Sequence, residues 1–261
     1  MYKKKTYTRS DLSRIAAMVM KEHGLEPEFS SDVRNQLGLL NAPGEDRDPH
    51  IHDLTELLWC SLDNDDSQDL DQLTTCSAID NGKHKIFIAI ADVDVLIKKD
   101  SPIDQHAKIN TASVYTSARI FPMLPEKLST NLTSLNLNET RLALVTEVII
   151  GQHGEVIGST IYRAKVRNKA KLAYDAVSAW IEGKESMPAG IACVPGMDEQ
   201  IKMQDSLAQQ LREKRYLSGS LHLQIFQPKA IFEGDNIIGI AEQVQNRGRQ
   251  LIEELMIATN E

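Results

Sequence analysis

An acidic stretch, DNDDSQDLDQL, begins at Asp63, and five of its eleven residues are aspartates. Three uses compete for clustered carboxylates: a solvated loop, a calcium loop of the EF-hand type, and a magnesium site. The calcium pattern requires glycine and glutamate at the positions where this sequence has Gln68 and Thr74. Mg²⁺ prefers carboxylate oxygens, water and phosphate, and paired ions can serve phosphodiester hydrolysis. A magnesium site is therefore the hypothesis, and a solvated loop is the alternative.

Convergence of the carboxylates depends on the local backbone. Asp69 and Asp71 project to the same side if their segment is extended, because side chains alternate along a strand. Asp63 can reach the same point after a turn. We therefore expect these three side chains to meet around the metal.

A second pattern is cationic and lies in the stretch RAKVRNKAK. Its basic residues recur at every second position, and in a strand such residues share one face. Like charges in register repel one another, and a neighbouring polyanion would relieve the repulsion. The alternative is an exposed face whose charges only aid solubility. With an acidic metal cluster, the pattern predicts a nuclease that holds a nucleic-acid backbone. The five cations are Arg163, Lys165, Arg167, Lys169 and Lys171.

Residues 1–50 are expected to form a small helical region. Apolar residues recur with helical spacing over 12–19, and Ser10 is the predicted N-cap. A second short helix is predicted from about Ser31. The Pro- and Gly-rich segment 41–49 is interpreted as a linker.

From residue 54 onward, strand patterns predict a sheet. LTTCSAI, DNG and KHKIFIAIADV are typical of strand, turn and strand, because Asn-Gly adopts positive φ at little cost. A second hairpin is predicted over TRLALVTEVIIGQHGEVIGSTIYRAKV, with its turn near His153 and Gly154. Helices are predicted over 173–182 and 198–216, with a loop between them. The expected fold class is α+β, a mixed sheet with packed helices, preceded by the small helical region.

Composition narrows the class of protein. The chain has 261 residues, a formal net charge of −8 at pH 7, and 25% charged residues. The negative charge argues against nonspecific nucleic-acid binding, although a local basic track remains compatible with it. No apolar run is long enough for a membrane span, and the N-terminus lacks the core of a signal peptide. We therefore expect a cytoplasmic protein with no membrane partner. The three cysteines form no C-x-x-C pair and are expected to be reduced thiols.

Five blocks, in this order and spacing, resemble the catalytic RNB domain of the ribonuclease II family. The blocks are SLDNDDSQDLDQL, IAIADVDVLI, ASVYTSARIFPMLPEKLS, TSLNLNETRLAL and KAKLAYDAVSAWIEG. The resemblance covers roughly residues 54–261. It divides the chain into a helical region, 1–50, and the N-terminal portion of an RNB catalytic domain, 51–261. It implies Mg²⁺-dependent, processive hydrolysis of single-stranded RNA from the 3′ end, releasing nucleoside 5′-monophosphates.

The resemblance also assigns roles to residues. The metal motif of the family has an aspartate followed by others six, eight and nine residues later. Asp63, Asp69 and Asp71 match the first three positions, whereas the fourth is Gln72, whose amide brings no negative charge. The resemblance implies that these three residues hold the metal and that Asp69 and Asp71 are catalytic, Asp71 above all. Tyr115 falls where the family places a tyrosine that stacks on the base at the RNA 3′ end.

Other expectations follow from the same resemblance. Asp92 is expected to approach or brace the metal site, Glu253 and Glu254 to line the RNA channel, and the basic stretch to guide the strand. The later half of the catalytic domain, with its arginine-bearing block, is not among these residues, so a missing C-terminal portion is an expected partner. Two alternatives stay open: an RNA-binding module with weakened or lost catalysis, and a structural fragment that needs a second chain.

Overall fold

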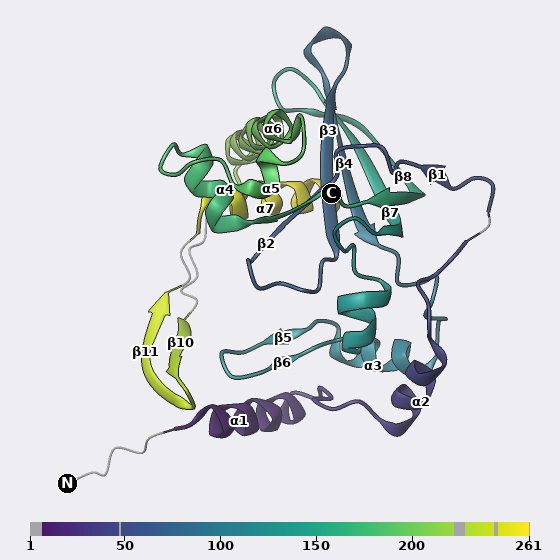
Figure 1. Ribbon diagram of the computed structural model, residues 1–261, viewed down its shortest axis with the longest axis vertical. Coiled ribbons are helices and arrows are strands. Elements are labelled where there is room, and N and C mark those ends of the chain that lie inside the picture. Colours follow the sequence, from purple (N-terminus) through teal and green to yellow (C-terminus); the bar gives the residue numbers. More distant parts are fainter. Residues whose placement is uncertain (1–6, 47, 222–227, 243–244, 261) are drawn as a thin grey trace. The chain divides into compact units, whose positions relative to one another are not determined.

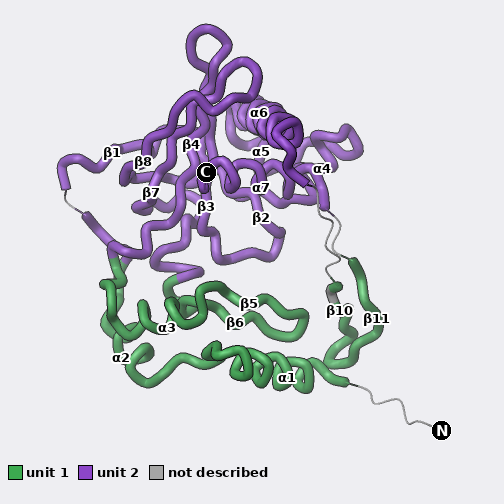
Figure 2. Tube along the Cα trace, turned by 180° about the vertical axis from the view of Figure 1, so that it is seen from behind, with its two compact units in different colours: residues 1–42, 96–128, 223–244 green, residues 43–95, 129–222, 245–261 purple. Residues whose placement is uncertain are grey.

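The computed structural model describes residues 7–46, 48–221, 228–242 and 245–260 (Figure 1). The chain divides into two compact units, each built from separate segments (Figure 2). Unit 1 comprises residues 1–42, 96–128 and 223–244, and unit 2 comprises residues 43–95, 129–222 and 245–261. The predicted helical region thus joins two later segments in unit 1, and a domain boundary after residue 50 stays a prediction.

Helix α1 (Arg9–Glu22) confirms the first predicted helix but starts earlier than expected. Its N-cap is Thr8, and the predicted N-cap Ser10 is wrong. Thr8 Oγ1 accepts a hydrogen bond from the Asp11 amide, and the Asp11 carboxylate accepts one from the Thr8 amide, each at 3.2 Å. This reciprocal capping box satisfies two amides that have no partner inside the helix, and it therefore sets the helix start.

The remainder of unit 1 packs short elements together. They are α2 (Ser31–Leu39), α3 (Pro102–Asn110), the hairpin of β5 (Val114–Tyr115) and β6 (Ile120–Phe121), and the hairpin of β10 (Pro228–Glu233) and β11 (Asn236–Glu242). His106 of α3 is buried, and its Nδ1 lies 3.0 Å from Glu26 Oε2. Asn110 Nδ2 donates to the Glu26 carbonyl oxygen at 2.9 Å. These contacts hold the chain after α1 against α3.

In the described part of unit 2, seven strands form one mixed sheet in the order β1-β8-β7-β4-β3-β2-β9. The strands are β1 (His52–Asp53), β2 (Cys60–Asp63), β3 (Gln72–Ala78), β4 (His84–Ala91), β7 (Thr140–Ile150), β8 (Val156–Arg167) and β9 (Ala170–Ala173). The pairs β1–β8 and β2–β9 are parallel, and the other neighbours are antiparallel. This arrangement confirms the predicted mixed sheet.

Both predicted hairpins are present. The turn between β3 and β4 places Asn81 and Gly82 at φ of 60° and 67°, the left-handed region that these two residue types tolerate best. The turn between β7 and β8 contains Gly154, as expected.

The passage from β8 to β9 shapes the sheet. The two strands lie at nearly opposite ends of the hydrogen-bonding order, yet only Asn168 and Lys169 separate them in sequence. Two residues span little distance, so the ends of the sheet must approach each other, and the sheet curls back on itself. The Lys169 amide donates to the Trp59 carbonyl oxygen at 2.9 Å, across this closure.

Four helices pack on one face of the sheet (Figure 1). They are α4 (Tyr174–Ile181), the single turn α5 (Ala189–Ala192), α6 (Met197–Leu217) and α7 (Arg247–Asn260). The expected loop between the two predicted helices therefore contains one helical turn. On β4, Ile86 and Ile88 face the helices, whereas Phe87 and Ala89 join a second core on the other face. This explains why β4 is apolar at successive positions.

None of the helices in the described residues is both long and apolar enough to cross a membrane.

Candidate active site

The acidic stretch leaves the sheet where two parallel strands end together. β2 ends at Asp63, and the chain then follows an irregular path to β3, which begins at Gln72. β9 runs parallel to β2, with Ala173 opposite Asp63. Because the carboxyl ends of parallel strands meet at one edge, Asn64 and Tyr174 leave the sheet on the same side.

The three predicted metal ligands interact electrostatically. Burial of the Asp71 carboxyl, the negative charge of Asp63 and then that of Asp69 raise the pKa of Asp71 to about 6, although the residue keeps an exposed side. Burial raises the pKa of Asp63, hydrogen bonds from Asn64 and Ser67 lower it, and the charge of Asp69 raises it again. The structure therefore brings the three carboxyl groups near one another.

Two residues from distant segments, Tyr174 and Arg249, lie beside the carboxyl groups of Asp63, Asp69 and Asp71. We call these five residues the acidic centre. Burial raises the pKa of the Tyr174 phenol to about 12, and the nearby charges of Asp63 and Asp71 add to the increase. The guanidinium of Arg249, on α7, lies 4.7 Å from the centroid of the Tyr174 ring. Arg249 Nη2 also donates to Asn64 Oδ1 at 2.7 Å. Arg249 thus places a positive charge beside the carboxylate of Asp63.

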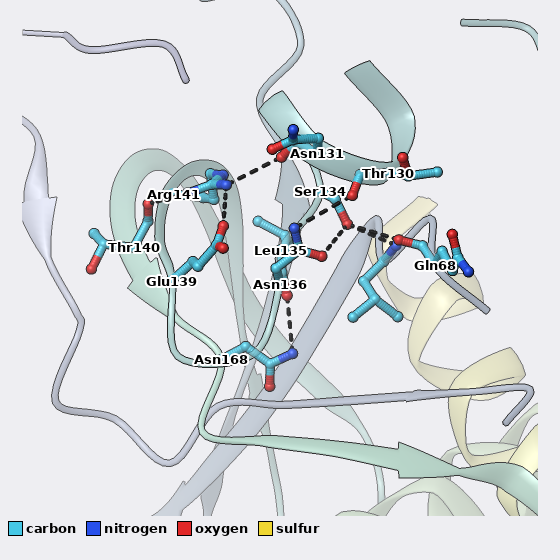
Figure 3. Close-up of polar contacts among 11 residues, drawn as sticks. Gln68, Thr130, Asn131, Ser134, Leu135, Asn136, Glu139, Thr140, Arg141 and Asn168 are labelled. Atoms are coloured by element: carbon cyan, nitrogen blue, oxygen red, sulfur yellow. Dashed lines mark hydrogen bonds and ion pairs between the residues drawn. The ribbon is translucent and has the colours of Figure 1, made fainter. Parts of the chain in front are cut away.

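The irregular segment between β2 and β3 is tied to the rest of unit 2. Lys171 Nζ donates to the Ser67 carbonyl oxygen at 2.6 Å. Ser134 Oγ donates to the Gln68 carbonyl oxygen at 3.1 Å (Figure 3). The same oxygen accepts a hydrogen bond from the Leu70 amide at 3.1 Å. These contacts fix the backbone on either side of Asp69.

The chemical type of the donors fits a hard divalent cation. Three mutually repelling carboxylates would be stabilised by such an ion. Among the residues described, however, no group of three or more His, Cys, Asp or Glu side chains is arranged as a metal cage. Mg²⁺ is often held by one or two carboxylates, with water and substrate phosphate completing its shell. The structure thus supports the ligand type but does not show three ligands converging on one point.

The cationic stripe is not a single strand, so that part of the prediction is wrong. Arg163, Lys165 and Arg167 lie on β8, whereas Lys171 lies on β9. The strand breaks between them at the buried Asn168, where the partner strand changes from β7 to β2. The alternation of outward cations and buried neighbours nevertheless continues through the break.

Arg163 and Asp92 pair with each other in the structure. Arg163 Nε lies 2.8 Å from Asp92 Oδ2, and Arg163 Nη2 lies 2.8 Å from Asp94 Oδ2. Asp46 Oδ2 is 3.5 Å from Arg163 Nη1. Asp92 therefore holds a cation of β8, and its expected approach to a metal stays a prediction.

The other residues named from the sequence fall in different surroundings. Tyr115 belongs to β5 in unit 1, where 63% of its surface is exposed, and its stacking role stays a prediction. Glu254 is buried and accepts two hydrogen bonds from Arg215, at 3.1 and 2.6 Å. Glu253 is exposed and accepts a hydrogen bond from Gln245 at 2.7 Å. Glu254 thus forms a partly buried ion pair with Arg215, and a role in an RNA channel stays a prediction for both glutamates.

Sequence reasoning missed Asn64, Ser134, Tyr174 and Arg249. Tyr174 directly follows a strand in the block KLAYDAV, and Ser134 lies in the block TSLNLNETRLAL, so both stood in stretches already singled out. No sequence pattern pointed to Arg249, because its contact with Asn64 joins residues far apart along the chain.

Known proteins resemble this chain over most of its length. The sequence profile of the RNB domain matches residues 51–261. Ribonuclease R of Vibrio cholerae is 32% identical over 246 residues, which cover 93% of this chain and 30% of that protein. Exoribonuclease 2 of Proteus mirabilis is 31% identical over 253 residues, which cover 92% of this chain and 38% of that protein.

A solved structure shares the fold. The structure of Mycoplasma genitalium RNase R in complex with ribose methylated single-stranded RNA superposes with a TM-score of 0.85 at 26% identity. The match covers 95% of this chain and 38% of that one. The chain therefore spans about a third of the length of the relatives it matches. The predicted α+β fold class and the resemblance noted in the sequence are both confirmed: this chain belongs to the RNB domain family.

Proposed function

We propose that this chain carries the acidic centre of a 3′-to-5′ exoribonuclease that hydrolyses single-stranded RNA to nucleoside 5′-monophosphates with Mg²⁺. The observation that carries the proposal is the coupling among Asp63, Asp69 and Asp71 at the shared end of β2 and β9. Membership of the RNB domain family supports it, since relatives are named ribonuclease R and exoribonuclease 2.

Each residue of the centre has a proposed task. Asp63, Asp69 and Asp71 would hold the ion, with Asp69 and Asp71 closest to the chemistry. When bound, Mg²⁺ would activate water and offset charge at the scissile phosphate. Lys165, Arg167 and Lys169 would attract the RNA backbone, and Tyr115 would stack on a base at the 3′ end.

The test is degradation of single-stranded RNA labelled at its 5′ end, with Mg²⁺ and with EDTA. The proposal expects a ladder of shortening labelled products and release of nucleoside 5′-monophosphates only when Mg²⁺ is present. Asp71→Asn should abolish the ladder, because the amide has the same shape but no negative charge. Asp66→Asn is the matched control, since Asp66 is an exposed acid of the same segment.

The outcomes separate the alternatives. If the labelled mononucleotide were released first, hydrolysis would start at the 5′ end, contrary to the proposal. Activity in EDTA would show that hydrolysis does not require Mg²⁺. If Asp71→Asn and Asp66→Asn lost RNA hydrolysis equally, the acidic segment would act only through its overall negative charge, and no specific role for Asp71 would be supported.

A second candidate is an RNA-binding module without hydrolysis. Gln72 supplies an amide at the fourth position of the acidic motif, and no three-ligand cage is formed among the described residues. This candidate expects RNA retention in a filter-binding assay with no shortening at any Mg²⁺ concentration.

A further inference from the structure

We infer that Ser134 and Asn168 form a buried polar clamp that positions the acidic segment between β2 and β3. The inference rests on the proposed function, because the clamp would determine where the metal-binding carboxylates lie. Both residues are positioning residues and lie outside the acidic centre itself. Ser134 and Asn168 are each 1% exposed, so neither is placed to contact RNA.

Ser134 holds the far end of the segment. Its Oγ accepts a hydrogen bond from the Leu70 amide at 3.1 Å. The single hydroxyl proton faces two acceptors, the Gln68 carbonyl oxygen at 3.1 Å and Asn136 Oδ1 at 3.0 Å. The bonded backbone groups lie on both sides of Asp69, so the hydroxyl fixes the backbone from which this carboxylate projects.

Asn168 holds the near end and joins it to Ser134. Its Nδ2 donates to Ser61 Oγ at 3.1 Å, on β2 two residues before Asp63. The same group donates to the Leu135 carbonyl oxygen at 2.9 Å (Figure 3), and Leu135 follows Ser134 directly. The Leu135 amide in turn donates to the Leu70 carbonyl oxygen at 2.8 Å. One connected set of bonds therefore spans the segment from β2 to the residue before Asp71.

Because the hydrogen bonds of Ser134 and Asn168 are buried, they can fix the backbone conformation of the acidic segment. Residues 64–70 belong to no strand, whereas the Asp71 carbonyl oxygen accepts a hydrogen bond from the Ala91 amide at 2.9 Å. The shape of residues 64–70 therefore depends on contacts made by other parts of unit 2. A buried polar group without its partner is costly, so the clamp favours one backbone conformation over others. Loss of such outer-shell support typically weakens metal affinity about 10- to 100-fold.

Two measurements test the clamp in the full chain. Hydrogen–deuterium exchange reports the backbone order of residues 64–71, and electron paramagnetic resonance of Mn²⁺ reports ion binding without any turnover. Ser134→Ala and Asn168→Ala should speed exchange in this segment and weaken Mn²⁺ binding about 10- to 100-fold. Ser134→Thr, which keeps the hydroxyl, should recover both signals. Ser61→Ala removes the hydrogen bond from Asn168 with little change in volume. It would be measured in place of Ser134→Ala or Asn168→Ala if either of these fails to fold.

Thr74→Val is the matched control. It deletes a buried hydroxyl whose 2.7 Å bond goes to Gln204 of α6 and leaves the acidic segment alone. The inference is overturned if the clamp variants exchange like the wild type, if Thr74→Val produces the same changes, or if exchange rises while Mn²⁺ affinity stays constant. Failure of the wild type to bind Mn²⁺ or cleave RNA would instead refute the proposed function, and the exchange data would still decide whether the clamp holds the segment.

Discussion

Asp63 and Ala173 are direct partners in the parallel pairing of β2 and β9, and the residues that follow them, Asn64 and Tyr174, are both contacted by Arg249. This one guanidinium therefore links the first turn of α7 to the ends of two strands. The link joins segments that are far apart in sequence, and it contains the only cation–π contact of the described acidic centre.

Arg249→Gln should lower the free energy of unfolding by about 1–2 kcal/mol, because it removes a hydrogen bond to Asn64 and the attraction to the Tyr174 ring. The stability of Arg249→Lys should lie between those of the wild type and Arg249→Gln, since an ammonium keeps the charge but lacks the planar guanidinium group. Urea denaturation measures the difference. Arg14→Gln is the control: Arg14 is largely exposed on α1, and its loss should change stability little. Equal effects at both positions would contradict the link.

Asp71→Asn should stabilise the protein in EDTA at pH 7. The pKa of Asp71 is raised from 3.8 to about 6 in the folded state, so the folded protein binds this proton more tightly than the unfolded chain does. Stability from this group is therefore greatest at low pH and falls as the pH rises between about 4 and 6. We expect a gain of about 1 kcal/mol at pH 7, since the exposed side of the residue screens the full effect.

Thermal unfolding of wild type and Asp71→Asn between pH 4 and pH 8, in EDTA, measures this gain. The two proteins should converge at the acidic end, where the wild-type carboxyl is already protonated. A variant that is less stable than wild type at pH 7 would show that the carboxylate has a compensating partner.

Arg163→Ala should destabilise unit 2 by about 2–3 kcal/mol, because it leaves the buried carboxylate of Asp92 without its cation. Lys165→Ala, at the next outward position of β8, should change the unfolding free energy by less than about 0.5 kcal/mol. Chemical denaturation compares the two. If both substitutions cost the same, the pairing of Arg163 with Asp92 contributes nothing to stability.

The cations before and after Asn168 should have different roles: those before it should affect RNA affinity, and Lys171 after it should affect the cleavage rate. Combined Lys165→Ala and Arg167→Ala should weaken RNA binding and reduce the slope of log affinity against log salt by up to about 2, one for each phosphate that is no longer neutralised. Lys171→Ala should mainly lower the cleavage rate, because its ammonium supports the Ser67 carbonyl in the acidic segment. Fluorescence anisotropy over a salt series and single-turnover cleavage distinguish binding from rate. Identical behaviour of all three substitutions would favour one continuous track.

Local patterns predicted much of this fold. Asn81 and Gly82 marked the turn between β3 and β4, and the stretch KHKIFIAIADV marked β4 as a strand. The acidic stretch stood out because five aspartates are crowded into eleven residues, where their charges repel one another. Thr8 escaped detection as a cap because Ser10 offers the same chemistry two residues later, and only the reciprocal bond with Asp11 distinguishes them.

Long-range consequences were not predictable in the same way. The alternation of cations continues across Asn168, so the break between β8 and β9 leaves no trace in the periodic pattern. At the break, the Asn168 amide donates hydrogen bonds to Ser61 and Leu135, which are far from it in sequence. The pairing of Arg163 with Asp92 and the position of Arg249 likewise depend on tertiary contacts between residues far apart in sequence.

The pairing of β2 with β9 joins residues about 110 positions apart along the chain. The hairpins β3–β4 and β7–β8 close short loops and can form early, whereas this parallel pairing must wait for most of the domain to collapse. During synthesis, the ribosome must release residue 173 before Asp63 acquires its neighbouring strand. Nascent chains shorter than this therefore carry the three aspartates without the parallel strand that pairs with the end of β2.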